Sequence, residues 1–293
     1  MNLLFICKNS YNNLTKKYFE IYRLSHKVTS MHDLAFVFAG FFVGFVVGLT
    51  GVGGGSLMTP LLIFFFGVKP HLAIGTDLLF AAFTKLGGSI KLARARVIDW
   101  RVVGQMALGS VPASLITLYI LDKVGATDPA VQHVMTTTLG FALLLTAAAT
   151  LYKAVLGKAV ARHIHADDIK AATKPKHWSL PVLFGVIIGA LVTLTSVGAG
   201  AIGVTVLMLL YPMLPLPRIV AADIAHAVPL TLVAGFGHAS IGSVDWSLLA
   251  LLLAGSLPGI WVGSHLMLKT PDRVIRSLLS VLLAYAGFKL IAL

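Results

Sequence analysis

Long apolar segments alternate with short polar ones along almost the whole chain. The apolar segments cover residues 33–49, 56–68, 71–91, 101–121, 134–156, 180–197, 201–213, 219–240, 246–267 and 274–292. Most approach the ~20 residues that a helix needs to cross the hydrocarbon core of a bilayer. Lipid offers no hydrogen-bond partners, so only helices or closed barrels span it, and these segments are too long and too continuously apolar for barrel strands. The pattern predicts an all-α polytopic membrane protein.

Composition and charge agree with this prediction. Of the 293 residues, 57% are apolar and 12% are charged, whereas a soluble domain has about a quarter charged residues. The 23 Lys and Arg exceed the 11 Asp and Glu, which gives a net charge of +12. Because the cations lie mainly between apolar segments, we interpret them as anchors in cytoplasmic loops and expect no nucleic-acid partner. The single cysteine, Cys7, excludes an intrachain disulfide and a cysteine-built metal site.

The chain divides into two transmembrane repeats. We expect a basic N-terminal tail over residues 1–32, repeat 1 over 33–157, a polar cytoplasmic linker over 158–179 and repeat 2 over 180–293. Met31 precedes the first apolar segment, which leaves Met1 and Met31 as alternative starts. Matched pairs between the repeats include Gly44 and Gly189, Thr50 and Thr195, Gly53 and Gly198, Gly55 and Gly200, Asp77 and Asp223, Asp99 and Asp245, Trp100 and Trp246, Ser110 and Ser256, and Pro112 and Pro258. Such internal repeats are typical of secondary transporters.

The number of membrane crossings depends on two short segments, 56–68 and 201–213, which are shorter than the hydrocarbon core. If they enter without crossing, the chain has eight spans and parallel halves. If they cross, it has ten spans, inverted halves and an outside N-terminus. The loop 91–101 carries Lys91, Arg94, Arg96 and Arg101, whereas its counterpart 239–245 carries no Lys or Arg. Because cations concentrate on the cytoplasmic side, this difference favours the inverted repeat.

A glycine-rich motif ends the first apolar segment of each repeat. It reads Gly48-Leu49-Thr50-Gly51-Val52-Gly53-Gly54-Gly55-Ser56 in repeat 1 and Thr193-Leu194-Thr195-Ser196-Val197-Gly198-Ala199-Gly200 in repeat 2. Each glycine costs a helix ~1 kcal/mol relative to alanine, so the motif is expected to break the helix. Irregular backbone at membrane depth is tolerated only in protein or beside a watery cavity. The alternative is that the glycines only allow close helix crossing, as we expect for Gly40, Gly44 and Gly48.

A broken helix directs the free N–H groups and the positive dipole end of the next helix at the cavity, where an anion fits best. The predicted substrate-binding residues are therefore Thr50, Gly51, Gly53, Gly54, Gly55, Ser56, Thr195, Ser196, Gly198 and Gly200, together with the cation Lys85. Lys85 lies within an apolar segment, where a charge costs ~2.5 kcal/mol or more, so it is expected to serve a substrate or an acid.

Two acids also lie inside apolar segments, Asp77 and Asp223, at matched positions of the repeats. Intramembrane acids are functional by default because a carboxylate at the membrane centre is costly. With His226 nearby, these residues are candidates for proton coupling. The alternative for Asp77 is a structural capping role near a helix end.

These motifs resemble the TauE/SafE sulfite-exporter family, the TSUP transporters. The similarity is carried by the stretch from Gly48 to Pro60, by Gly75-Thr76-Asp77, and by the basic loop ending in Asp99-Trp100, and it covers residues 33–293. The resemblance implies a multi-pass protein of the bacterial inner membrane. It also implies secondary transport of small sulfur-containing or organic anions such as sulfite, sulfoacetate or thiosulfate.

The leading hypothesis is therefore a secondary transporter or exporter of a small sulfur-containing anion, with proton coupling, no cofactor and no bound metal. Whether it forms a homodimer is left open. The alternative is a cation or metal transporter that uses Asp77 and Asp223. An enzyme is not expected, because Leu57 follows Gly54-Gly55-Ser56 where an intramembrane serine protease has glycine. The chain also lacks His-Glu-x-x-His and a Walker loop.

Overall fold

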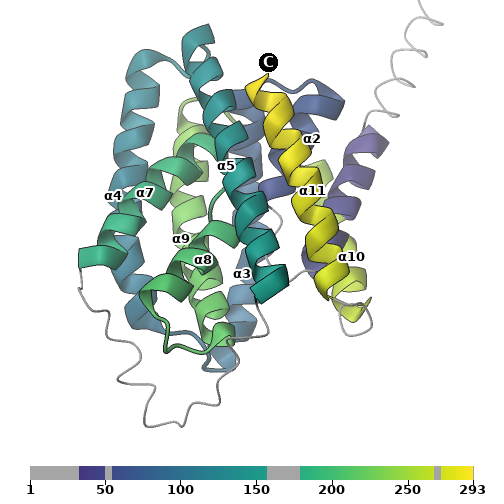
Figure 1. Cartoon of the computed structure of the whole chain (residues 1–293). Helices are drawn as coiled ribbons and strands as arrows, with labels where there is room; N and C mark the ends of the chain where they lie inside the picture. The colour runs from purple at the N-terminus through teal and green to yellow at the C-terminus, as the bar shows by residue number, and fades with distance from the viewer. Residues whose placement is uncertain (1–32, 50–54, 157–178, 267–271, 293) are drawn as a thin grey trace, which may run out of the picture.

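The structure is a computed structural model in which residues 33–49, 55–156, 179–266 and 272–292 are described. All regular structure in these ranges is helical, which confirms the predicted all-α fold. The first repeat contains an N-terminal helix over Asp33–Leu49, then α2 (Gly55–Phe66), α3 (Pro70–Arg94), α4 (Trp100–Val124) and α5 (Pro129–Leu156). The second contains α7 (Ser179–Thr195), α8 (Ala201–Leu210), α9 (Leu216–Ser240), α10 (Trp246–Leu266) and α11 (Asp272–Ile291), as Figure 1 shows. The predicted tail and nearly all of the linker lie outside the described residues.

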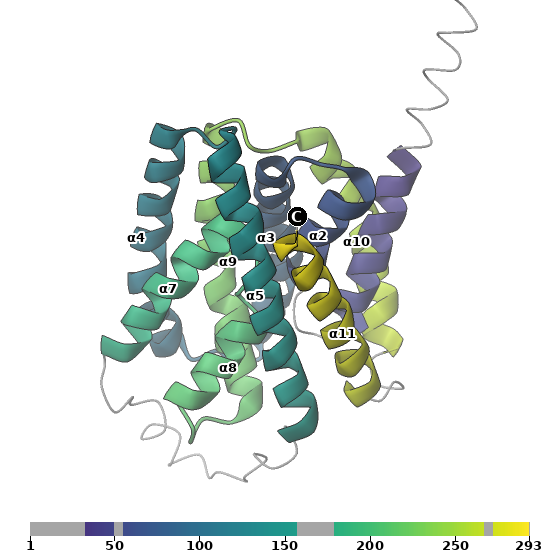
Figure 2. The same cartoon turned by 45° about the horizontal axis from the view of Figure 1, so that its top comes forward.

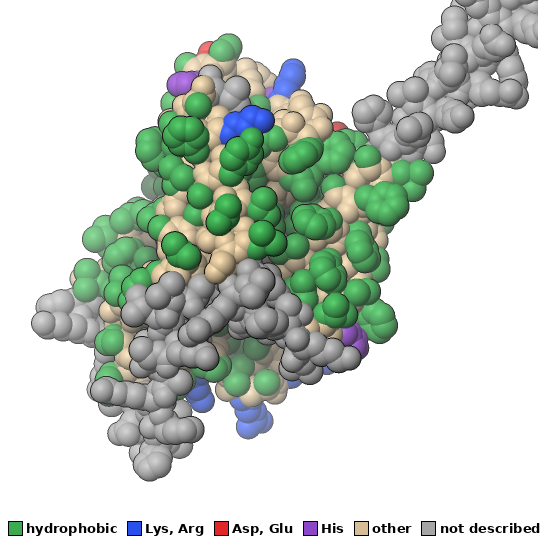
Figure 3. Space-filling model, turned by 45° about the vertical axis from the view of Figure 1, so that its right-hand side comes forward, with side chains coloured by type: hydrophobic (Ala, Val, Ile, Leu, Met, Phe, Trp, Pro, Cys, Tyr) green, Lys and Arg blue, Asp and Glu red, His purple; other side chains and the backbone are tan. Residues whose placement is uncertain are grey.

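The length and composition of the helices are those of a membrane protein. Among the described residues, four helices are long and apolar enough to cross a membrane: α4, Pro129–Tyr152 of α5, α9 and α10. The two short segments are short helices, since α2 has 12 residues and α8 has 10. At about 1.5 Å per residue, neither reaches across the hydrocarbon core alone. On the face shown in Figure 3, hydrophobic side chains cover the middle, and Lys and Arg lie toward the upper and lower ends.

Helix starts follow local capping chemistry. The Asp99 side chain accepts hydrogen bonds from the backbone N–H groups of Arg101 and Val102, at 3.1 and 3.3 Å, and α4 begins directly after it. Its counterpart Asp245 accepts a 3.0 Å hydrogen bond from Leu248 N before α10. These carboxylates bind amide groups that have no partner within the helix. Asp99 and Asp245 therefore act as helix N-caps at equivalent positions of the two repeats.

Helices from different repeats pack closely through glycines. The N-terminal helix lies against α10, where a Cβ atom at Gly40 or Gly44 would collide with the backbone of Leu252 or Ser256. In the same way α7 lies against α4, and a Cβ atom at Gly189 would collide with the backbone of Ser110. The expected role of Gly40, Gly44 and Gly48 in close helix crossing is confirmed. The two repeats therefore exchange their first helices and form one interlocked bundle.

Equivalent helices of the two repeats run antiparallel. On α3, Gly75 lies against His238 of α9, and Leu79 lies against Gly235, so the contacts move backwards along α9 as they advance along α3. Helices α5 and α11 are also antiparallel. Gly140 of α5 contacts Ile291 and Gly287 of α11, whereas Leu144, one turn later on α5, contacts the earlier residue Gly287. Figure 2 shows α3 and α9 side by side in the middle of the bundle. The last residues of α3 and α9 therefore lie at opposite ends of the molecule.

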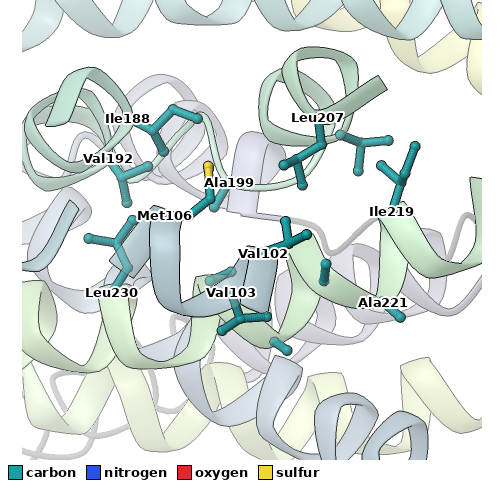
Figure 4. Close-up of a cluster of buried hydrophobic side chains, with 14 of the residues drawn as sticks. Val102, Val103, Met106, Ile188, Val192, Ala199, Leu207, Ile219, Ala221 and Leu230 are labelled. Carbon is teal, nitrogen blue, oxygen red and sulfur yellow. The ribbon is translucent and has the colours of Figure 1, made fainter. Parts of the chain in front are cut away.

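A buried apolar cluster holds the segment between α7 and α8 in place. It joins Val102 and Met106 of α4, Val192 of α7, Leu207 of α8 and Leu230 of α9, and further members are labelled in Figure 4. Ala199, from the segment that separates α7 and α8, belongs to the same cluster. The cluster, which also includes residues of α3 and α5, thus fixes the position of a backbone segment that has no regular structure of its own.

Candidate functional site

The second glycine-rich motif is a helix break, as predicted. Helix α7 ends at Thr195 and α8 begins at Ala201. The backbone φ angles are 59° at Ser196, 132° at Gly198 and 131° at Gly200. Glycine adopts such angles without steric cost, whereas Ser196 carries a Cβ atom that disfavours them. The break is buried within the bundle, with Ser196 only 4% exposed.

The Thr195 hydroxyl belongs to the end of α7. It donates to Leu191 O at 2.6 Å and accepts from Val197 N at 3.1 Å. Its hydrogen is therefore engaged by the backbone, and Thr195 shapes the break. The neighbouring Ser196 differs, because its buried hydroxyl has no hydrogen-bond partner among the described residues. Of these two predicted donors, Ser196 has the hydroxyl that remains available to a ligand.

Lys85 connects the first repeat to the break in the second. Its side chain is buried at 6% exposure, and its Nζ atom donates a 3.1 Å hydrogen bond to Ala199 O. Asp77 and Asp223 both lie close enough to attract its ammonium group electrostatically. Asp77 is on the same helix, whereas Asp223 comes from α9. The structure therefore brings together three of the four ionisable residues that the sequence singles out, and the fourth, His226, is described below.

Asp77 lies where α2, α3 and the break meet. Its side chain is fully buried, and Thr59 Oγ1 of α2 donates to its Oδ2 atom at 2.5 Å. The Ser196 side chain also approaches this carboxyl group. The alternative capping role is wrong, because Lys69 occupies the N-cap position of α3 and Asp77 lies about two turns further on.

Asp223 and His226 complete the site from α9. Asp223 is 1% exposed, and its carboxyl group packs against α8 so closely that a Cβ atom at Gly203 would collide with Oδ1. His226 is equally buried, and its Nε2 atom is hydrogen-bonded to Ser110 Oγ of α4 at 2.8 Å. The other ring nitrogen, Nδ1, has no hydrogen-bond partner among the described residues, so this Ser–His contact lacks the orienting carboxylate of a hydrolase triad.

The remaining predicted residues belong to the first motif. Thr50, Gly51, Gly53 and Gly54 lie outside the described residues. Gly55 is the first residue of α2, and Ser56 is half-buried in its first turn. The described part of the chain contains no group of three or more His, Cys, Asp or Glu that could hold a metal ion.

Sequence reasoning missed two polar side chains of the site, Thr59 and Ser110. In the sequence, Ser110 stands out only as a repeat match to Ser256, and Thr59 only as part of the long motif. A stronger signal was available, because each is a hydroxyl inside an apolar segment, where an unpaired polar group is costly. Such a group needs a partner, and here the partners are Asp77 and His226.

Known proteins are similar to this chain over most of its length. A family model described as sulfite exporter TauE/SafE matches residues 36–290. The probable membrane transporter protein YjnA of Bacillus subtilis (strain 168) is 36% identical over 259 residues, which cover 88% of this chain and 100% of the relative. The probable membrane transporter protein YunE of the same organism is 27% identical over 271 residues, or 89% and 98% of the two chains. No solved structure matches the chain. By the extent of these matches, this membrane protein belongs to the TauE/SafE sulfite exporter family of membrane transporters.

Proposed function

We propose that this membrane transporter is a secondary transporter of small sulfur-containing anions, such as sulfite, thiosulfate or an organosulfonate, and that the anion binds beside Lys85. The observation that carries the proposal is the buried ammonium group of Lys85, 3.1 Å from the carbonyl oxygen of Ala199 in the helix break. A buried cation is costly unless it serves a counter-charge. The description of the matching family, sulfite exporter, supports the choice of anion.

The charges around Lys85 favour proton coupling. One ammonium group faces the carboxyl groups of Asp77 and Asp223, so an incoming anion meets two acidic neighbours. Repulsion between like charges in a medium of low polarity is strong unless an acid takes up a proton. Anion binding and proton binding therefore favour one another, and this linkage is reciprocal. Asp77 or Asp223, with His226 beside the site, would carry the proton.

The arrangement of the helices supports alternating access between two inverted repeats. Equivalent helices pack antiparallel, as seen for α3 with α9 and for α5 with α11. In the proposed topology the two repeats are inverted in the inner membrane, and the N-terminus lies outside. The repeats would then rock against each other around a site near the middle of the bilayer.

Transport by purified protein in liposomes tests the proposal. Uptake of radiolabelled sulfite should fall by about tenfold or more in Lys85→Gln, since ~1.4 kcal/mol of lost binding already produces that change. Lys91→Gln is the matched control, because Lys91 is an exposed cation on the same helix. Its uptake should equal that of the wild type. Undiminished sulfite uptake by Lys85→Gln, at equal protein content, would contradict the proposed anion site.

A further inference from the structure

Two further histidines, His71 and His238, are buried away from Lys85. They lie near the start of α3 and the end of α9, with exposures of 4% and 0%. The His238 side chain packs against Gly75, one helical turn after His71. His238 Nε2 lies 2.9 Å from Thr193 O, and because a carbonyl only accepts, Nε2 donates this hydrogen bond. The Nδ1 atoms of both rings are buried without a hydrogen-bond partner among the described residues.

Buried polar atoms normally have a partner, so these two Nδ1 atoms indicate that something polar passes or binds here. On one side, the residues around this histidine pair lead toward the protein surface. The half-buried side chain of Gln132, on α5, contacts His71, and the exposed Lys69 is a charged group that acts on that ring. His71 itself is the ionisable group that faces His238. This pair therefore lies between the end of the bundle and its interior.

Polar side chains continue from His238 to the centre of the molecule. Thr193, whose carbonyl binds His238, also joins its hydroxyl to Ser114 Oγ of α4 at 2.8 Å. Ser110 lies one turn earlier on α4, about 6 Å along the helix axis, which one water molecule can bridge. Ser110 is bonded to His226 at 2.8 Å. The side chains of Thr193, Ser114, Ser110 and His226 are all 1% exposed or less.

The last part of this series reaches the proposed transport site. His226 lies one turn after Asp223 on α9, and Lys85 is the charged group that acts on its ring. A series of buried polar groups, with gaps of about one helical turn between some of its members, thus leads from the end of the bundle to a carboxyl group next to Lys85. We define the histidine route as His71, His238, Ser114, Ser110 and His226, with Thr193 as the residue that positions His238 and Ser114.

The route exists in only one of the two repeat-related places. At the counterparts of its members the chain has Pro217, Leu92, Ile260, Ser256 and Phe80, and Gly48 corresponds to Thr193. Only Ser256 among these has a polar side chain. At the repeat-related positions, the equivalent helices pack together with mostly apolar side chains. The polar residues of the route are therefore not needed for these helices to pack. A function restricted to one end of the bundle explains the difference.

We propose that the histidine route conducts protons between Asp223 and the end of the bundle where α3 begins and α9 ends. The inference rests on the proposed proton-coupled transport and names the path that the proton takes. His71 takes up a proton and passes it to His238, each hydroxyl accepts one proton as it releases its own, and His226 delivers a proton to Asp223. Water molecules fill the gaps of one helical turn. The Thr193 carbonyl cannot relay a proton, so the His238 ring must turn away from it. We expect this rotation to control the rate of proton movement along the route.

Proteoliposomes that contain an internal pH-sensitive dye test this route. A sulfite gradient is applied, and the rate of proton movement is compared with sulfite affinity measured on the same purified protein. His238→Asn keeps an N–H donor for Thr193 O but has no ring nitrogen to protonate, and Ser114→Ala removes one hydroxyl of the route outside the proposed anion site. Both should slow sulfite-driven proton movement about tenfold or more, with sulfite affinity within about twofold of the wild type. His265→Asn is the matched control, because His265 is exposed at the end of α10.

Chemical rescue separates proton transfer from a structural role. In His71→Ala, external imidazole should restore proton movement, because it supplies the missing ring near the end of the bundle. If the route variants move protons at the wild-type rate, the histidine route is wrong although coupled transport stands. If the wild type moves sulfite without protons, both the coupling and the route are wrong. If sulfite is not transported at all, the failure lies in the proposed function.

Discussion

The Nζ atom of Lys85 on α3 donates a 3.1 Å hydrogen bond to the carbonyl oxygen of Ala199, which lies in the break between α7 and α8. Within a continuous helix, each carbonyl oxygen accepts a hydrogen bond from the N–H group four residues further along. The break interrupts this pattern, so the carbonyl oxygen of Ala199 is accessible. The counterpart of Lys85 is Thr231, whose hydroxyl donates to Ala227 O of its own helix at 2.7 Å. Only one of the two equivalent positions therefore joins the repeats, and the site is asymmetric.

Ser196→Gly should weaken anion binding without weakening the fold. The φ angle of 59° suits glycine better than serine, and Gly51 occupies the corresponding place in repeat 1. Thermal stability should therefore be equal or slightly higher. Loss of the hydroxyl beside Asp77 should lower methanesulfonate affinity about tenfold, or roughly 1.4 kcal/mol. Calorimetric titration measures the affinity, and Ser240→Gly, at the exposed end of α9, serves as its control. An unchanged affinity would remove Ser196 from the site.

Asp77→Asn and Asp223→Asn should separate the anion hypothesis from a cation transporter. If protonation of an acid assists the anion, methanesulfonate affinity in the wild type falls as pH rises, because the acids become charged. Methanesulfonate keeps its charge throughout, so its own titration does not interfere. Asparagine resembles the protonated acid, and each variant should bind methanesulfonate with a weaker pH dependence.

Asp122→Asn, at an exposed position near the end of α4, is the control for these two variants. Its affinity should follow the wild-type dependence on pH. Divalent-cation binding by the wild type that both site variants lose, with no methanesulfonate binding by the wild type, would instead favour the cation transporter.

Gly189→Ala and Gly88→Ala should shift stability in opposite directions. A Cβ atom at Gly189 would collide with the Ser110 backbone at the crossing of α7 and α4, and overpacking of this kind costs about 1–3 kcal/mol. Gly88 lies inside α3 with nothing within 4 Å of the position of a Cβ atom, so alanine should stabilise the helix by up to ~1 kcal/mol. Thermal unfolding in detergent measures both. A stabilised Gly189→Ala would show that the crossing is looser than described.

Cysteine labelling tests the inverted topology. In a Cys7→Ser background, single cysteines are introduced at Arg94 and Ser240, the exposed last residues of α3 and α9. The antiparallel packing of these helices places the two positions at opposite ends of the bundle. A membrane-impermeant maleimide should therefore label them from opposite sides of the membrane. Labelling of both from the same side would exclude the inverted repeat.

Several local features followed directly from neighbouring residues. The apolar segment 71–91 became α3, Pro70–Arg94, and 246–267 became α10, Trp246–Leu266. The segment 134–156 starts earlier in the structure, at Pro129, because the Asp128 side chain accepts a 2.8 Å hydrogen bond from Ala130 N and caps the helix. The predicted segment 201–213 forms a shorter helix, α8, which ends at Leu210. Pro212 has no N–H group and disfavours helical backbone at the preceding residue, Tyr211.

The sequence alone determined the helices, the duplicated order, the capping acids and the break at Ser196, because hydrophobic length, capping and glycine conformation act between residues that are close along the chain. Tertiary structure decided which polar groups meet. It placed Thr59 on Asp77, Lys85 on Ala199 and Ser110 on His226, and it turned the Thr195 hydroxyl toward its own backbone. These contacts depend on how helices cross and rotate against each other. That arrangement is set by close packing at positions such as Gly189, which joins elements far apart in sequence.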